Sequence, residues 1–404
     1  MKRQLLQLLL AGLMLVTVNA AFGQGTTTSS INGRVTDTSG ETLPGATVLA
    51  VHTPSGSRYG NITNSDGFYR IPNMRVGGPY TVTVTFIGYK EFKRENVYLT
   101  LGQAFKINAE LTETSVSLDA VEVVADRSSV FDGNRTGSET VVGLEQINAT
   151  PTVARAIGDF ARFTPQATID EGNDGFSISI GGQNNRLNSI YIDGAVNNDV
   201  FGLAGSGTNG GQTGVSPISI DAIEQFQIQV APFDVRVSGF AGGAVNAITR
   251  SGSNEIEGSV YRFWRNENFA GRTPRDTEGD RDRLDEFSAQ TYGVRVGGPI
   301  IKDKLFYFVN YEKQEDETPQ PFDFGDYEGD ATAGDITALR NYLGTFGGYD
   351  PGTISGNPVV LESDKLTAKV DYNINQNHKI SARYSYVKAD NIEGVRSSPR
   401  TLKF

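Results

Sequence analysis

The sequence predicts a mainly β protein made of three successive parts: a small β-sandwich, a glycine-rich α+β module, and the first strands of an incomplete outer-membrane β-barrel. Three observations support this prediction. Short alternating strands occupy residues 31–111, glycine is dense within residues 138–250, and longer alternating segments separated by loops of unequal length follow residue 255. Alternation of apolar and polar residues with a period of two is typical of strands that bury one face.

The overall composition excludes several classes of protein. The 404 residues carry 36 Lys plus Arg against 47 Asp plus Glu, a formal net charge of −11. Nucleic acid is therefore not an expected partner, because affinity for the phosphate backbone rests on cationic side chains. The chain has no cysteine, which excludes disulfides, thiolate catalysis, cysteine metal sites and a lipid-modified N-terminal cysteine.

Residues 1–23 have the pattern of a signal peptide. Lys2 and Arg3 are basic, residues 5–18 are almost all apolar, and the small residues Ala20 and Gly23 follow. An uncleaved membrane anchor is the alternative, but the apolar run is shorter than the roughly 20 residues that a spanning helix needs. We therefore expect export across the inner membrane.

Residues 26–112 are predicted to form the sandwich. The segments expected to be strands are Ile31–Val35, Ala46–Val51, Tyr80–Phe86 and Phe105–Leu111. Within the third of these, Tyr80, Val82, Val84 and Phe86 share one face and threonines share the other. Short strands at regular spacing, separated by glycine-containing turns, are typical of such a fold. Residues 138–250 are less regular, with a helix predicted over Thr152–Phe163.

Residues 251–404 are predicted to contribute the barrel strands. These are Ile256–Asn266, Ser288–Ile300, Leu305–Glu315, Lys365–Ile374 and Lys379–Ala389. About ten residues is the length of a tilted membrane-spanning strand. In the fourth strand Leu366, Ala368 and Val370 oppose Thr367, Lys369 and Asp371.

The connections between these strands alternate in length. Residues 267–287 and 316–364 are long and acidic, whereas 302–304 and 375–378 are short. Outer-membrane barrels have long loops outside and short periplasmic turns. A soluble β-sandwich, the alternative, does not require this parity. Because so few strands cannot close a barrel, we expect Phe404 to be a truncation.

Four segments of the predicted sandwich resemble the carboxypeptidase-regulatory-like domain, which has a carbohydrate-binding-like fold. They are Ile31–Val35, Leu43–Val48, Thr63–Tyr69 and Phe86–Tyr89. Residues 138–250 resemble the plug that fills the lumen of TonB-dependent outer-membrane receptors. The matching segments are Ile178–Arg186, Ile190–Gly194, Ala222–Phe226, Ala231–Arg236 and Gly239–Asn246. Gly181 stands where many plugs carry an arginine before glycine, which favours the Oar-like branch over the glycan-importing branch.

Between sandwich and plug, residues 113–137 form a linker in which the family keeps its energy-coupling (TonB-box-like) peptide. The resemblance places that peptide at Leu118, Asp119, Ala120, Val121, Glu122, Val123 and Val124. An extended β-branched segment can pair with the sheet edge of another protein. The alternative is that it forms a strand of the sandwich or plug.

Two polar plug segments are candidates for ligand contact: Asn184, Asn185 and Arg186, and Asn197, Asn198 and Asp199. The alternative is hydrogen bonding between plug and barrel.

Other motifs are rejected. Gly205–Gly210 fits a dinucleotide pattern, but no strand–helix context surrounds it. His52 and His378, predicted at the surface or in turns, are too few and too scattered for zinc or triad chemistry. Asp170–Gly175 has glycine at calcium-ligand positions. No catalytic residue, cofactor or metal is expected.

The resemblance implies a ligand-gated transporter in the cell outer membrane, surrounded by outer-membrane lipid. It implies energy from the inner-membrane proton gradient, delivered by TonB of the TonB–ExbB–ExbD complex. Small molecules, oligosaccharides and peptides all stay open as ligands. The sandwich and coupling peptide would lie in the periplasm. The competing hypothesis is a cell-surface or periplasmic carbohydrate-binding or adhesion protein.

Overall fold

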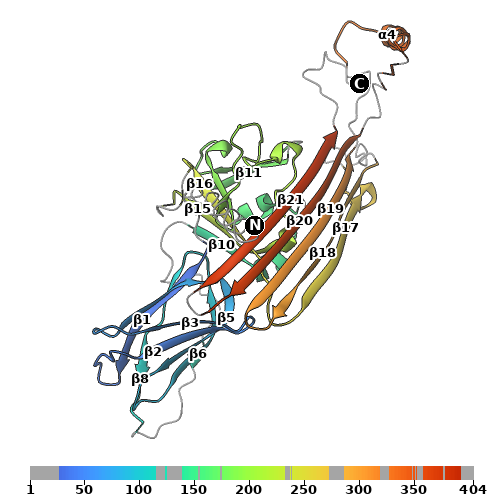
Figure 1. Ribbon diagram of the computed structural model, residues 1–404. Coiled ribbons are helices and arrows are strands. Elements are labelled where there is room, and N and C mark those ends of the chain that lie inside the picture. Colours follow the sequence, from blue (N-terminus) through green and yellow to red (C-terminus); the bar gives the residue numbers. More distant parts are fainter. Residues whose placement is uncertain are drawn as a thin grey trace, which may run out of the picture.

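The computed structural model describes residues 27–114, 123–124, 139–152, 155–172, 175–232, 237, 239–272, 286–318, 327–347, 349–350, 352, 358–375 and 378–392. The predicted signal peptide, Leu118–Glu122 of the predicted coupling peptide and Phe404 lie outside these residues. A sandwich, a plug and a curved sheet follow one another along the chain (Figure 1). Within the described ranges, no helix is long and apolar enough to cross a membrane.

The sandwich packs two sheets against each other. One contains β1 (Ser29–Asp37), β4 (Phe68–Met74), β7 (Ala104–Lys106) and β8 (Ala109–Leu111). The other has the order β3-β2-β5-β6-β9, formed by Ser57–Ile62, Thr47–His52, Gly77–Thr85, Phe92–Leu99 and Val123–Val124. Tyr80, Val82 and Val84 are fully buried, and Phe86 packs against the same core. The predicted face of this strand is confirmed.

His52 is buried, which corrects the prediction of a surface or turn residue. The residue ends β2, where Val48, Ala50 and His52 alternate toward the core. Its Nδ1 lies 2.7 Å from the Ser55 hydroxyl oxygen, and its ring centroid lies 4.9 Å from that of Tyr80. Burial, and then the positive charges of Arg75 and Lys379, lower the pKa of His52 from its usual 6.5 to about 3. His378 is exposed beside a turn, as predicted.

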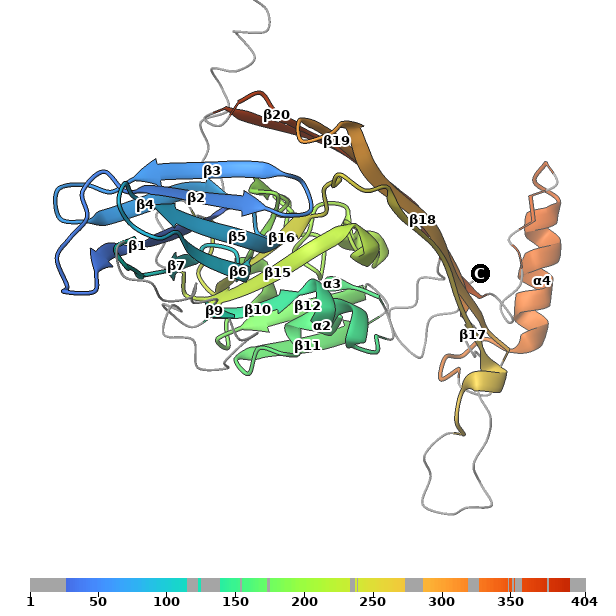
Figure 2. The same cartoon turned by 90° about the horizontal axis from the view of Figure 1, so that it is seen from below.

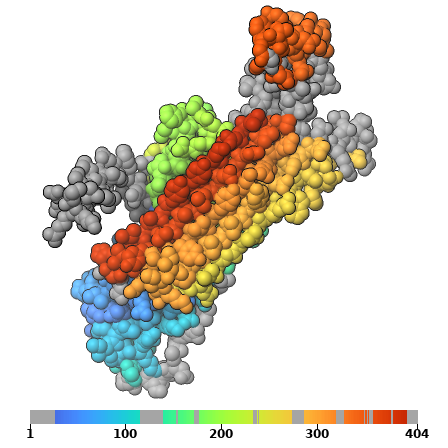
Figure 3. All heavy atoms as spheres, turned by 45° about the vertical axis from the view of Figure 1, so that its right-hand side comes forward, coloured from blue at the N-terminus to red at the C-terminus, as the bar shows by residue number. Residues whose placement is uncertain are grey.

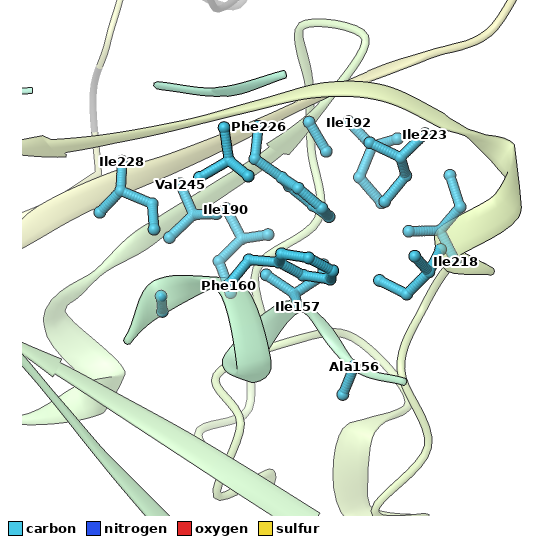
Figure 4. Packing of buried hydrophobic residues seen from close by; sticks show 14 of the residues in the cluster. Ala156, Ile157, Phe160, Ile190, Ile192, Ile218, Ile223, Phe226, Ile228 and Val245 are labelled. Atoms are coloured by element: carbon cyan, nitrogen blue, oxygen red, sulfur yellow. The ribbon is translucent and has the colours of Figure 1, made fainter. Parts of the chain in front are cut away.

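The plug contains a central mixed sheet of order β10-β15-β16-β13-β14, formed by Glu139–Gly143, Ile223–Val230, Gly243–Thr249, Ser189–Ile192 and Ala195–Val196. The hairpin of β11 (Ala167–Gly172) and β12 (Gly175–Ile180) accompanies it. The helical segments are α2 (Leu144–Ala149), α3 (Ile157–Ala161), η1 (Asn185–Leu187), η2 (Gly211–Thr213) and η3 (Ile220–Ala222). Phe160 of α3 stacks on Phe226 of β15 with ring centroids 5.4 Å apart (Figure 4).

The predicted helix over Thr152–Phe163 is too long. Arg155 adopts a positive φ of 51°, and Ala156 is extended, so the helix begins only at Ile157. It ends at Ala161, and Pro165 follows shortly after. A residue before proline is restricted to extended conformations, which stops a helix. The short helix α2 was not predicted.

The third part is an antiparallel sheet of order β17-β18-β19-β20-β21. Its strands are Glu257–Asn266, Ser288–Ile301, Leu305–Thr318, Val359–Asn373 and Lys379–Ile392. The predicted order and the two short turns are confirmed, while several strands are longer than expected, up to 15 residues in β20. The 3-10 turn η4 (Glu267–Phe269) follows β17, and the longest connection carries α4 (Ala333–Gly344). The sheet arches over the plug, and α4 lies at the end of the strands away from the sandwich (Figure 2).

Burial in β20 is the reverse of that in a soluble protein, while the neighbouring β19 buries Phe306 and Phe308. In β20 the side chains of Ser363, Lys365, Thr367 and Lys369 are buried under the plug, whereas Val370 and Tyr372 are each 41% exposed on the other face. Figure 3 shows this outer face, with the sandwich at one end of the strands. Strands that alternate apolar outside and polar inside are typical of outer-membrane barrels.

The burial of His52 makes the stability of the sandwich depend on pH. Unfolded His52 takes up a proton below about pH 6.5, whereas the folded residue stays neutral down to about pH 3. In this window the unfolded state therefore binds more protons than the folded state. The free energy of unfolding decreases by about 1.4 kcal/mol for each unit by which the pH is lowered. Native-state hydrogen exchange of β2 and β5 amides at pH 7 and pH 5 measures it. His52→Gln removes this contribution; an unchanged slope in that variant would contradict the assignment.

Candidate functional site

Only the end of the predicted coupling peptide falls within the described residues. Val123 and Val124 form β9, which pairs in parallel with β6 of the sandwich, opposite Arg94 and Glu95. For these two residues the structure matches the alternative of a strand added to the sandwich. A two-residue edge strand is also a segment already extended for pairing with another sheet.

The first set of predicted ligand residues surrounds η1. The Asn184 side chain accepts a hydrogen bond from the Arg186 backbone N–H at 3.0 Å. Asn185 donates through Nδ2 to the Gly205 carbonyl. The side chains of Asn184 and Arg186 are exposed. Two of the three residues therefore hold the loop together, while the Arg186 guanidinium faces solvent.

The second set organises the loop after β13. Asn198 Oδ1 accepts from the Ile190 N–H at 2.7 Å, and its Nδ2 donates to the Ser189 hydroxyl at 3.2 Å. Asp199 accepts from the N–H groups of Leu203 and Ala204 at 2.5 and 2.6 Å.

The Ala204 N–H is the main cause that lowers the pKa of Asp199. Among the described residues, Asn197 Nδ2 is a buried donor without a partner. The loop that these residues shape exposes the apolar side chains of Val200, Phe201 and Leu203. The site is thus a shaped plug loop with one free amide donor.

A charged cluster joins the plug to the barrel wall. Asp193 follows β13 with a φ of 48°. Its carboxylate accepts from the Thr249 N–H at 2.8 Å and lies 3.2 Å from Arg383 Nε of β21. Lys369 Nζ of β20 lies 3.8 Å from the same carboxylate and donates to the Thr249 carbonyl at 3.1 Å. Arg383 also donates to the Ile192 carbonyl at 3.0 Å.

A second polar contact between plug and wall involves an ion pair within the wall. Lys365 Nζ donates to Glu312 Oε1 at 3.0 Å. The other carboxylate oxygen accepts from Ser219 of the plug and from the Tyr261 hydroxyl, each at 2.8 Å. Glu312 and Lys365 are almost fully buried. Because their charges compensate each other, the wall can present them to the plug without an isolated buried charge.

Arg155 adds a third link between plug and wall. Its guanidinium pairs with Asp221 within the plug. The same group lies 4.0 Å from the ring centroid of Phe263 and 5.2 Å from that of Tyr261, both on β17. Cation–π contacts of this kind are attractive and tolerate small displacements.

Sequence reasoning assigned no role to Asp193, Glu312 or Arg155. Asp193 lies in the segment Ile190–Gly194 that carries the plug resemblance, and Lys369 and Arg383 occupy polar faces of two predicted strands. The sequence therefore contained a signal for this ion-pair cluster: an acidic residue in the plug together with cations on the polar faces of the predicted strands. In the described residues, no group of three His, Cys, Asp or Glu side chains could hold a metal ion.

Three family models match successive parts of the chain. They are the carboxypeptidase regulatory-like domain over residues 30–112, the TonB-dependent receptor plug domain over 117–245, and an outer membrane beta barrel domain over 248–359. The chain thus carries the domains that the sequence resemblance implied, and these domains place it in the outer membrane.

Two curated relatives share parts of this chain. The TonB-dependent transporter Oar of Myxococcus xanthus is 29% identical over 315 residues, which are 72% of this chain and 27% of Oar. The probable TonB-dependent siderophore receptor PirA of Acinetobacter baumannii is 32% identical over 190 residues, 44% of this chain and 23% of PirA. The chain therefore spans about a quarter of the length of these relatives.

Among solved structures, the siderophore receptor PirA from Acinetobacter baumannii is similar to this chain. It aligns with a TM-score of 0.41 and 21% identity, covering 63% of this chain and 32% of that one.

The buried pair on the wall can be tested by a double-mutant cycle in the full-length protein. Lys365→Met leaves the Glu312 carboxylate without its cation, and we expect a loss of about 3–5 kcal/mol in the free energy of unfolding. Combining it with Glu312→Gln removes both charges, and most of that loss should be recovered. Denaturant unfolding in detergent micelles measures both. Equal losses in the single and double variants would show that the ion pair is not the cause.

Proposed function

Because the chain carries the plug and barrel domains of TonB-dependent receptors, we propose that it is part of a ligand-gated outer-membrane transporter. A ligand binds from outside, the plug shifts, and TonB transmits force derived from the proton gradient. The protein performs no chemistry on its cargo. The cargo is a small molecule, oligosaccharide or peptide.

The observation that carries this proposal is the polar contact between plug and wall. The plug has an apolar core built around Phe160, Phe226 and Ile228, to which the wall contributes Phe308 of β19. Its links to the wall include the ion pairs of Asp193 and the hydrogen bond of Ser219 to Glu312. Water that enters as the plug moves can replace these hydrogen-bond partners, so their net contribution is smaller than their strength in isolation. A plug held in this way can shift as a folded unit.

We propose that Leu118–Val124 is the segment that TonB of the TonB–ExbB–ExbD complex engages. TonB would add it as a strand to its own sheet, so that main-chain hydrogen bonds carry the force. Val123 and Val124 are already extended against β6, which supports a segment suited to strand pairing.

Ligand contact is proposed at the shaped plug loops. Arg186 offers an exposed cation and Phe201 an exposed aromatic ring. Polar donors beside apolar surface are the usual composition of a small-molecule site.

Deleting residues 118–124 from the full-length receptor tests the function. We expect cells to lose energised uptake of the cargo to the level of a strain without TonB, while binding at the cell surface is retained. The matched control deletes the seven residues 126–132, which shortens the same linker equally and leaves the proposed peptide intact. Uptake that survives the first deletion but not the second would refute the assigned role.

A further inference from the structure

The sandwich rests against both the plug and the barrel wall, at the end of the strands opposite α4 (Figures 1 and 2). The contact lies beside the short turns of the wall. The Asn254 backbone N–H donates to the Pro54 carbonyl at 2.8 Å, and Asn373 Nδ2 donates to the Ser57 hydroxyl at 2.8 Å. The Lys379 ammonium lies 2.9 Å from the ring centroid of Tyr59.

The sandwich loop at Gly56 has a backbone conformation that allows close contact with the wall. Gly56 has a φ of +61°, and a Cβ at this position would lie 1.9 Å from Asp303 Oδ1 in the wall turn. The same Asp303 oxygen accepts from Asn254 Nδ2 at 2.7 Å. The glycine therefore allows the sandwich loop to approach the turn closely.

The sandwich also contacts the plug through its own loops. The Leu101 N–H donates to Gln225 Oε1 at 2.9 Å, and Gln227 Nε2 donates to the Leu101 carbonyl at 3.0 Å. Leu101 is buried in a small apolar cluster with Val76 of the sandwich and Ile248 of the plug. Gln225 and Gln227 belong to β15, the strand that also carries Phe226 of the plug core, so a shift of the plug would break these contacts.

The sandwich covers the seam between plug and wall. A cavity of about 820 Å³ lies where the three parts meet. Tyr59 and Arg75 of the sandwich line it, together with Asp193 of the plug and Lys369 and Arg383 of the wall. Arg75 reaches across to the carbonyls of Ser251 and Gly252, where the plug chain enters the wall, at 3.4 Å each. The charged cluster that joins plug and wall is thus beneath the sandwich.

The contact of the sandwich with the plug and the wall is weaker than the packing inside the sandwich. Among the described residues it includes hydrogen bonds, the cation–π contact of Lys379 and a three-residue apolar cluster, whereas the core of the sandwich itself is large and continuous. Polar contacts between domains of one chain resemble transient interfaces. Each hydrogen bond contributes only about 0.5–1.5 kcal/mol net. The sandwich can leave the mouth without unfolding.

The path of the chain determines which parts receive force. Val123 and Val124 pair with β6 of the sandwich, and the chain continues from there to β10 of the plug. Tension applied at residues 118–124 therefore acts on the edge of the sandwich as well as on the plug.

We propose that the sandwich is a removable seal on the periplasmic mouth of the pore. At rest it covers the seam between plug and wall, and under tension from TonB it leaves its seat before the plug moves. This inference rests on the proposed transport function.

The absence of cysteine from the chain allows a direct test. Ser57→Cys with Asn373→Cys places one thiol on each side of the seat, and a short bis-methanethiosulfonate reagent joins them reversibly. In the purified full-length receptor we expect the double variant to be joined in at least fivefold higher yield than random encounter gives. The single variants Ser57→Cys and Asn373→Cys supply the controls for chemical modification without a link.

The joined and reduced receptors are then pulled singly in a lipid bilayer through the periplasmic domain of TonB as the probe. The reduced receptor should show a first release event at low force, before the plug extends. In the joined receptor that event should disappear and the first event should need at least twice the force; reductant should restore the original trace.

Three outcomes would overturn the proposal in distinguishable ways. No joining above background would show that the sandwich does not sit on the mouth. Joining with identical force traces would show that the seated sandwich is not the first part to move. Failure of the TonB domain to attach, with normal joining, would refute the proposed transport function and the release step. The position of the sandwich against plug and wall would still be established.

Discussion

The whole structure depends on the reversed burial of β20, the strand whose buried face is polar and whose exposed face carries apolar side chains. A strand that crosses lipid must satisfy its backbone groups through neighbouring strands and must direct apolar side chains outward. Its other face can then carry polar side chains, and the plug covers them here together with the buried Phe308 of β19. Lys365, Thr367 and Lys369 are buried by that cover, while Val370 and Tyr372 face outward. The polar character of the plug–wall contact follows from this constraint.

A plug held by polar contacts differs mechanically from one packed into an apolar core. Phe160 and Phe226 stabilise the plug as a unit, whereas Asp193 and Ser219 attach it to the wall. Water can replace the partners of the second kind at modest cost. The sandwich contacts the plug and the wall through polar groups in the same way. The sandwich and the plug each have an apolar core, and polar contacts join them to their neighbours.

The sequence predicted the strands well because their patterning is periodic. Tyr80, Val82 and Val84 alternate, and the short turns of the wall stand out by length alone. Local strain was not visible: the positive φ of Arg155 delays the helix that its apolar neighbours suggested. The burial of His52 and the pairing of Asp193 with Arg383 depend on residues far away in the chain. Such partners require the folded arrangement, whereas the domain order was readable from motifs.

The central claim is that one face of β20 meets lipid and the other meets the plug. It is tested most directly by placing a fluorophore on Val370→Cys and, separately, on Thr367→Cys in the full-length receptor in lipid vesicles. The account predicts strong quenching at position 370 by a quencher carried on the lipid acyl chains, with little quenching at position 367. Equal quenching at both positions, or none at 370, would contradict it.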